Sequence, residues 1–490
     1  MYKRFNSCLI HIISFFILLL IIPCVHSAAP NKNSYELLQK AADHGDANAQ
    51  YNLGVCYATG DGVAQDSNKA VKLFQQAADQ GLADAQYNLG VCYEKGDGIA
   101  KDATKAVEWY KKAADQGYVN AQYNLGVCYY KGKGVVKDLT KAVEWYKKAA
   151  DQGNASAQYN LGVHYATGDG VVQDLTKAVG LFQKAAEQGD ARAQFYLGWR
   201  YATGYGIAKD SAKAIEWLRK AADQGDAAAQ YNLGWCYTSG DGVTKDLVKA
   251  MEWYKKAAEQ GVAMAQSSLG SGYITGNGVI KDSAKAVEWY TKAAEQGFAE
   301  AQYNLGWCYA TGNGVTKDST KAVEWYKRAA EQGFAKAQFY LGEHYAIGDG
   351  ITEDLAKATE WYKKASDQGY ASAQYSLGVQ YINGEGVTQN LTKAAVLFQK
   401  AADQGFVKAQ YNLGVYYANG DGVAKDSAKA IELFQKAANL GLAEAQYTLG
   451  VRYAEGNGVT KDLTKAAELL QKAADQGHAD AQDALKRLFK

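Results

Sequence analysis

A period of 36 residues runs without interruption through most of this 490-residue chain. Twelve full copies occupy residues 49–480, and a half copy lies on each side of them. Such a regular repeat argues against the several globular domains that length alone suggests, because short copies bury their apolar surface only against their neighbours. The period is marked by a Leu-Gly pair whose glycine recurs at Gly54, Gly90, Gly126, Gly162, Gly198, Gly234, Gly270, Gly306, Gly342, Gly378, Gly414 and Gly450.

Each copy predicts two helices joined by a glycine turn. In the first copy, Ala49, Leu53 and Tyr57 recur at every fourth residue, which predicts a first helix over about residues 49–59 with one apolar stripe. The two glycines of segment 60–62 predict the turn, because glycine adopts a positive φ without a steric penalty.

The ends of the second helix are also readable in the sequence. Asp66 predicts its N-cap, since a carboxylate there accepts hydrogen bonds from free backbone amides, and Gly81 predicts its C-terminal end. The cap is Asp in eleven copies and Asn390 in the remaining one. Small residues such as Gly54 and Ala77 would let the two helices approach closely.

These features predict the fold class, which is all-α. We expect a right-handed α/α superhelical solenoid of twelve 36-residue helix-turn-helix repeats. A leader and half-repeat helix would occupy residues 28–48, the repeats residues 49–480, and a polar C-terminal capping helix residues 481–490. We expect the chain to be a monomer.

The N-terminus predicts export. Lys3 and Arg4 precede an apolar run at residues 9–22, and small residues follow, as in a secretory signal peptide over residues 1–27. The run is short for a membrane span, so we expect cleavage near Ser27, no stable membrane insertion afterwards, and a secreted or periplasmic protein. An uncleaved anchor and a lipoprotein attached at Cys24 are the alternatives.

The charge balance excludes one class of partner. Lys plus Arg total 53 and Asp plus Glu total 52, so the formal net charge is +1. Binding to nucleic acid normally requires an excess of positive charge, so no nucleic acid is expected as a partner.

The repeat resembles a known family. Copies over residues 85–120 and 121–156 follow Ala-x-x-x-Leu-Gly-x-x-Tyr-x-x-Gly-x-Gly-Val-x-x-Asp-x-x-Lys-Ala-x-x-Trp-x-x-Lys-Ala-Ala-x-x-Gly almost letter for letter. This pattern resembles the Sel-one-like repeat, a subclass of the tetratricopeptide-like superfamily, from about Tyr35 to the C-terminus. The resemblance implies that one side of each first helix lines a concave surface. It also implies an adaptor role, as in relatives that act in host interaction, cell-envelope regulation and signalling.

A second apolar stripe on the first helices supplies candidate binding residues. One of its positions is aromatic in eleven of twelve copies, with Ser267 as the exception. Aromatic rings in a groove bind peptide, partner helix or glycan, but the same rings could simply pack between successive first helices. The candidate partner-binding residues at this position are Tyr51, Tyr87, Tyr123, Tyr159, Phe195, Tyr231, Tyr303 and Phe339.

Tryptophan replaces the usual valine at a neighbouring position of three copies, as Trp199, Trp235 and Trp307. We expect these three side chains to be exposed in the groove, because a core position would resist such a change in volume. The other seven tryptophans, such as Trp109, lie on second helices, where we expect core or inter-repeat packing.

One copy departs from the others, with Ser267, Ser268, Ser271 and Gly272 in place of larger residues. This copy therefore interrupts the series of aromatic residues between the copies that carry Trp235 and Trp307. The interruption indicates a pocket or a flexion point, or else simple sequence drift in a single copy. The residue before each alanine-glutamine pair also varies, for example as Glu300 or Lys336, which indicates either a tuned rim or a neutral surface.

Cysteine and histidine give no sign of a metal site. Equivalent positions in neighbouring repeats are about 8–10 Å apart, beyond the reach of a disulfide or a shared metal ion. We therefore expect buried free thiols, no metal and no cofactor, and we expect His164 and His344 to be surface or half-buried residues. The cysteines of the repeats share one position, as Cys56, Cys92, Cys128, Cys236 and Cys308.

The leading functional hypothesis is an exported scaffold, not an enzyme, that binds a protein or peptide on its concave aromatic surface. Cysteine-rich members of the resembled family are linked to penicillin binding or β-lactam hydrolysis, but the second helices here lack the matching cysteines. The motifs Ser-x-x-Lys, Lys-Thr-Gly and His-Glu-x-x-His are also absent from the sequence. An envelope enzyme of the β-lactamase or cell-wall glycan-hydrolysing type and a glycan-binding protein remain the alternatives.

Overall fold

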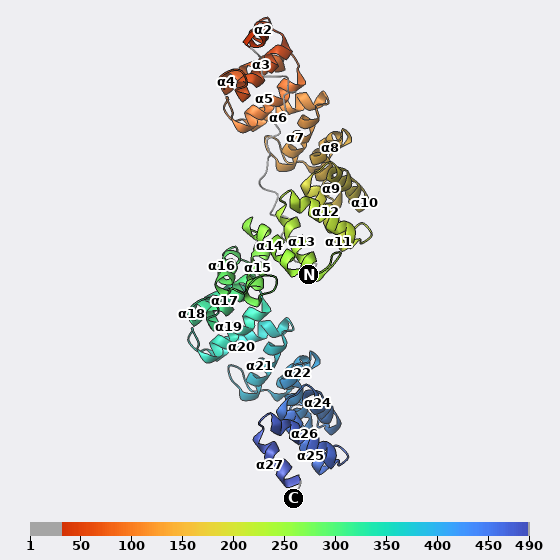
Figure 1. Ribbon diagram of the computed structural model, residues 1–490, viewed down its shortest axis with the longest axis vertical. Coiled ribbons are helices and arrows are strands. Elements are labelled where there is room, and N and C mark those ends of the chain that lie inside the picture. Colours follow the sequence, from red (N-terminus) through yellow and green to blue (C-terminus); the bar gives the residue numbers. More distant parts are fainter. Residues whose placement is uncertain (1–31, 489–490) are drawn as a thin grey trace. The chain divides into compact units, whose positions relative to one another are not determined.

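The computed structural model describes residues 32–488, which form 26 helices and no strand (Figure 1). The predicted signal peptide at residues 1–27 lies outside the described residues. The first helices of the repeats, each followed by a glycine turn, are α3 (Ala47–Thr59), α5 (Ala83–Lys95), α7 (Val119–Lys131), α9 (Ala155–Thr167), α11 (Ala191–Thr203), α13 (Ala227–Ser239), α15 (Ala263–Thr275), α17 (Ala299–Thr311), α19 (Ala335–Ile347), α21 (Ala371–Asn383), α23 (Val407–Asn419) and α25 (Ala443–Glu455).

The second helices follow the same spacing and alternate with the first. They are α4 (Ser67–Asp79), α6 (Ala103–Asp115), α8 (Leu139–Asp151), α10 (Leu175–Glu187), α12 (Ser211–Asp223), α14 (Leu247–Glu259), α16 (Ser283–Glu295), α18 (Ser319–Glu331), α20 (Leu355–Asp367), α22 (Leu391–Asp403), α24 (Ser427–Asn439) and α26 (Leu463–Asp475). The half copies supply α2 (Lys32–Asp43) and α27 (Ala479–Leu488). The predicted all-α solenoid of two-helix repeats is confirmed.

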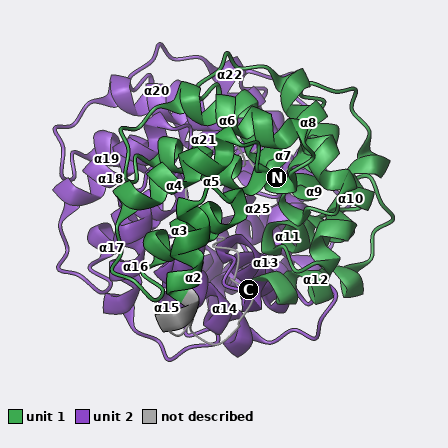
Figure 2. Cartoon of the chain, turned by 90° about the horizontal axis from the view of Figure 1, so that it is seen from above, with its two compact units in different colours: residues 1–221 green, residues 222–490 purple. Residues whose placement is uncertain are grey.

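The chain divides into two units, residues 1–221 and 222–490 (Figure 2). The boundary falls inside α12, between Ala221 and Ala222, so each unit consists of consecutive repeats. Among residues 32–488, no helix is long and apolar enough to cross a membrane.

The core of each repeat lies between its two helices. Leu53 on α3 and Phe74 on α4 are 0% and 3% exposed. Gly54 lets the phenylalanine ring lie directly on α3, because a Cβ on this glycine would be 2.8 Å from Phe74 Cε1. The close helix approach expected from the small residues is therefore confirmed, and its reason is the aromatic ring beneath the glycine.

The turn and cap residues behave as their chemistry predicts. Gly60 and Gly62 have φ angles of 80° and 74°. The Asp66 carboxylate accepts a hydrogen bond from the Lys69 amide at 3.0 Å, and Asn390 caps α22 in the same way. The second turn glycine has a further role, since a Cβ on Gly98 would collide with the backbone of the preceding repeat.

A recurring set of glutamine contacts links the helices, and we call it the glutamine chain. Gln50 is 5% exposed and donates its amide to the Ala42 carbonyl at 3.2 Å. Gln80, at the end of α4, donates to Gln50 Oε1 at 2.8 Å. The same donor-acceptor contact recurs at Gln116–Gln86, Gln152–Gln122, Gln188–Gln158, Gln260–Gln230, Gln296–Gln266, Gln332–Gln302, Gln368–Gln338, Gln404–Gln374 and Gln476–Gln446.

Candidate functional site

In each of the two units, the aromatic stripe of the first helices defines a surface that we call the ladder face. It consists of the side chains at the positions of Tyr51 and Val55 in each repeat. All the aromatic candidates are half-buried rather than exposed, namely Tyr51, Tyr87, Tyr123, Tyr159, Phe195, Tyr231, Tyr303 and Phe339.

Packing explains this partial burial. The Tyr303 ring centroid lies 5.8 Å from that of Tyr326 on the second helix of its own repeat, and 5.5 Å from that of Phe334, the N-cap residue of α19. Tyr87 is held similarly by Tyr110 and Tyr118. Each ring therefore contributes one face to repeat packing, and a binding role for these rings stays a prediction. Burial raises the pKa of Tyr87 and Tyr303, so both hydroxyls remain protonated hydrogen-bond donors.

The three ladder-face tryptophans differ in exposure. Trp235, in the second unit, is 42% exposed. Trp307 is half-buried among the side chains of the two repeats around it. Trp199, in the first unit, is half-buried against Tyr205, with ring centroids 6.1 Å apart. The three tryptophans were expected to be exposed, and Trp235 is, whereas neighbouring side chains cover part of the Trp199 and Trp307 rings.

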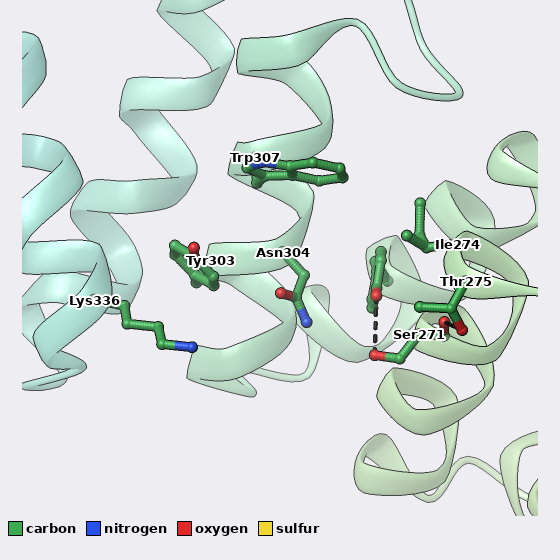
Figure 3. Close-up of a pocket in the computed structure, with 8 residues that line it drawn as sticks. Ser271, Ile274, Thr275, Tyr303, Asn304, Trp307 and Lys336 are labelled. Carbon is green, nitrogen blue, oxygen red and sulfur yellow. Dashed lines mark hydrogen bonds between the residues drawn. The ribbon is translucent and has the colours of Figure 1, made fainter. Parts of the chain in front are cut away.

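A pocket of about 320 Å³ lies at the divergent copy (Figure 3). The Ser271 hydroxyl on α15 lies 3.0 Å from that of Tyr290 on α16, so the floor of the pocket is a hydrogen-bonded pair. The residues that line the pocket are Ser271, Ile274, Thr275, Tyr290, Tyr303, Asn304, Trp307 and Lys336.

A small side chain makes room for this pocket. Ser271, which lines it, stands where most copies have valine. Trp307 and Asn304 project from α17 on one side and Ser271 from α15 on the other (Figure 3). The sequence left open a pocket or simple drift at this copy, and the structure places a pocket there.

The pocket offers a specific combination of groups. An indole face from Trp307 provides apolar area, while the Asn304 amide and the exposed Lys336 ammonium provide hydrogen-bond donors. Such a site can hold an apolar or aromatic side chain and at the same time bind an acceptor such as a peptide carbonyl. In the sequence, Lys336 is only one of the variable residues that precede each alanine-glutamine pair, and no signal distinguishes Asn304.

The tryptophans of the second helices lie away from this pocket and pack between repeats, as predicted. Trp145 contacts the cluster that includes Ala121 and Leu125 of the adjoining first helix. A basic side chain covers the outer face of each ring, for example Lys148 Nζ at 3.8 Å from the Trp145 centroid. The pairs of this kind are Lys112–Trp109, Lys148–Trp145, Lys220–Trp217, Lys256–Trp253, Lys292–Trp289, Arg328–Trp325 and Lys364–Trp361.

The expected free thiols are found at Cys92, Cys128, Cys236 and Cys308, of which the last three are buried. Cys56 and Cys92 are half-buried. Burial raises the pKa of Cys236 and Cys308 to about 11, which keeps these thiols protonated and unreactive at neutral pH. Among residues 32–488, no three side chains of the metal-binding types gather in a group that could hold a metal ion.

The prediction that His164 and His344 are surface or half-buried residues is wrong. They are 4% and 7% exposed. Each Nδ1 lies 2.7 Å from a turn carbonyl, that of Asp169 or Asp349, so the ring donates a hydrogen bond inside the repeat. Aromatic neighbours complete the burial, because the position points beneath the glycine turn rather than outward.

Comparison with known proteins gives a consistent result. The family model for the Sel1 repeat matches residues 30–46, 47–82, 83–118, 119–154, 155–190, 191–226, 227–262, 263–298, 299–334, 335–370, 371–406, 407–442 and 443–478. The full matches therefore start two residues before the predicted boundary at residue 49. None of the curated proteins matches the chain.

The solved structures similar to this chain include two proteins with the same kind of repeat. The protein c5321, described as a protective antigen present in uropathogenic Escherichia coli strains displaying an SLR fold, is 38% identical, with a TM-score of 0.81. That match covers 92% of this chain and 97% of c5321. A Sel1 repeat protein from Oxalobacter formigenes is 37% identical over 63% of this chain and 89% of its own length, with a TM-score of 0.49.

Proposed function

Since this chain belongs to the Sel1 repeat family, we propose that it is an exported, non-catalytic scaffold that binds a protein or peptide partner on its ladder face. Repeat solenoids of this kind typically serve protein interaction. Export is supported by the charged, apolar and small-residue segments of residues 1–27. A role in host interaction is supported by the similarity to c5321, which is described as a protective antigen, and a role in cell-envelope regulation is the alternative.

The observation that carries the proposal is the pocket beside Trp307. An extended peptide can place an apolar side chain against the Trp307 indole and a carbonyl oxygen near Asn304 or Lys336. The exposed Trp235 ring adds a second anchor on the same unit. Exposed tryptophans of this kind are the residue type that most often dominates binding energy in protein interfaces.

The test replaces the tryptophans of the ladder face. A triple variant with Trp199→Ala, Trp235→Ala and Trp307→Ala is compared with wild type in affinity capture from the native host. The matched control carries Trp253→Ala, Trp289→Ala and Trp325→Ala on the second helices, whose rings are covered by basic side chains. We expect loss of partner recovery in the ladder-face variant alone. Unchanged recovery with an intact helical circular dichroism spectrum would refute the proposal.

Binding of a glycan chain is the second candidate, because the exposed Trp235 ring could stack on a sugar. A glycan array separates it from peptide binding. Turnover of nitrocefin or peptidoglycan by the purified protein would contradict the non-catalytic assignment.

A further inference from the structure

The glutamine chain is broken once in the second unit. Leu440 stands at the end of α24, where Gln80 and its equivalents stand in the other repeats. The acceptor of the missing contact, Gln410 Oε1, is buried without a hydrogen-bond partner, and Gln410 is only 6% exposed. Its Nε2 keeps the usual contact with the Ala402 carbonyl at 3.4 Å, so the side chain has the same orientation as its equivalents.

Leu440 does not fill the place of the missing amide. Its side chain is 59% exposed. In the first repeat, the Gln80 amide donates both to Gln50 Oε1, at 2.8 Å, and to the Gly45 carbonyl, at 3.0 Å. The equivalent acceptors here are Gln410 Oε1 and the Gly405 carbonyl.

A pocket of about 490 Å³ is lined by both residues that carry these acceptors, Gly405 and Gln410. A second substitution enlarges it, because Leu433 stands where seven other repeats have tryptophan. Only the repeat of α23 and α24 combines leucine at both positions. The lining residues are Gln399, Ala402, Asp403, Gly405, Gln410, Tyr417, Lys429, Glu432, Leu433 and Lys436.

We propose that this pocket binds the side-chain carboxamide of a glutamine in a peptide. A primary amide carries two N–H donors on one nitrogen, which matches the two acceptors that Gln80 satisfies in the first repeat. An unsatisfied buried acceptor favours any ligand that supplies such a donor. Leu433 and Ala402 provide apolar contact for the methylene groups of the same side chain.

The charges around the pocket favour a neutral ligand. Lys436 Nζ pairs with Glu432 at 2.7 Å, and Lys429 Nζ pairs with Asp426 at 3.8 Å. The Asp403 carboxylate accepts from Gln399 Nε2 at 2.7 Å. Since two lysines and two carboxylates line the pocket, neither a glutamate nor a lysine side chain gains a net attraction there.

The test uses the mature chain and the peptide acetyl-Ala-Ala-Gln-Ala-Ala with an N-methylamide end, which has no other primary amide. Binding is followed by calorimetry and by the side-chain amide signals of the ¹⁵N-glutamine-labelled protein. We expect the side-chain amide signal of Gln410 to shift when the glutamine peptide binds. We also expect the matched glutamate peptide to bind about tenfold more weakly, because it lacks roughly two hydrogen bonds. Equal binding of the two peptides, or no shift at the solubility limit of the glutamine peptide, would overturn the proposal.

Two variants test the position of the site. Leu440→Gln supplies the missing amide from within the chain, and we expect it to weaken peptide binding about tenfold. Gln404→Leu removes the donor to Gln374 in the preceding repeat, where Leu397 already stands at the tryptophan position. We expect that variant to bind a second equivalent of peptide. Full binding by the Leu440→Gln variant, or a single site in the Gln404→Leu variant, would contradict the assignment.

Discussion

Met251 and Gly272 interlock across two successive repeats. A Cβ on Gly272 in α15 would lie 2.5 Å from Met251 Sδ in α14. The residues corresponding to Met251 and Gly272 are Val107 in the second copy and Cys128 in the third. The larger side chain on α14 is thus accommodated by the smaller residue on α15, so part of the divergent copy that forms the ladder-face pocket is a coupled change rather than independent drift.

This relationship predicts a non-additive pair of mutations. Gly272→Cys should lower the free energy of unfolding by about 1–3 kcal/mol, because the added side chain overlaps Met251. Combining it with Met251→Val, which restores the pair found elsewhere in the chain, should recover most of that loss. Urea denaturation followed by circular dichroism measures both effects. A double variant as unstable as Gly272→Cys alone would show that Met251 and Gly272 are not coupled.

The missing amide at residue 440 predicts a stabilising mutation. Leu440→Gln should satisfy Gln410 Oε1 and raise the local stability by about 1 kcal/mol, since the exposed leucine loses little apolar contact. Because repeat arrays unfold in parts, the suitable measurement is hydrogen exchange over α22 to α24. Leu463→Gln is the matched control, at a residue that is 50% exposed. Equal hydrogen-exchange protection of α22 to α24 in the two variants would contradict the claim that Leu440→Gln satisfies Gln410 Oε1.

Glu94 predicts a dependence of stability on pH in the first unit. Although burial opposes ionisation, hydrogen bonds from Lys133 and Tyr110 lower the pKa of Glu94 below its usual 4.5. The carboxylate lies 2.8 Å from Lys133 Nζ and 2.6 Å from the Tyr110 hydroxyl. A lowered folded-state pKa contributes stability that is present above pH 4.5 and is lost as the pH falls through the folded-state pKa.

The Glu94→Gln variant tests this contribution. Wild type should lose stability more steeply than the variant when the pH is lowered from neutral through this range, because glutamine does not titrate there. Chemical denaturation at several pH values provides the measurement. If the free energy of unfolding changes with pH in parallel for the two proteins, Glu94 is not the source of the pH dependence.

The buried thiols predict low reactivity in the folded protein. Burial raises the pKa of Cys128 to about 12 and that of Cys92 to about 11, so almost no thiolate is present at pH 8. In a mature Cys56→Ser background, four thiols remain, and all four should react slowly with a thiol reagent until urea is added. Rapid stoichiometric reaction of the native protein at pH 8 would contradict their burial.

Local chemistry made much of the fold predictable. The 36-residue period, the glycine turn at segment 60–62 and the Asp66 cap each depend on residues close together in the sequence. Gly54 was read correctly as a point of close approach because the small residue itself is the signal. Because these features recur from copy to copy, a substitution in one copy does not change the predicted fold.

Contacts between residues far apart in the sequence were not predictable in the same way. The Gln80–Gln50 contact joins the two helices of one repeat across 30 positions, and no cap, turn or periodicity signal points to it. The burial of His164 was missed because its partner is a carbonyl of the turn, which carries no side-chain signal. Of the ladder-face pocket, Ser271 and Trp307 were identified from their departure from valine, whereas Asn304 required the folded arrangement of α15 and α17.

The most direct measurement of the central claim is the affinity of a peptide ligand for ladder-face variants. Peptides selected from a random phage-displayed library against wild type would be assayed on a Trp235→Ala, Trp307→Ala variant and on a Trp289→Ala, Trp325→Ala control. Loss of a central tryptophan anchor typically costs at least about 2 kcal/mol, so we predict binding about 30-fold weaker to the first variant and unchanged binding to the control. Equal affinity for wild type and the ladder-face variant would contradict the claim that this surface binds the partner.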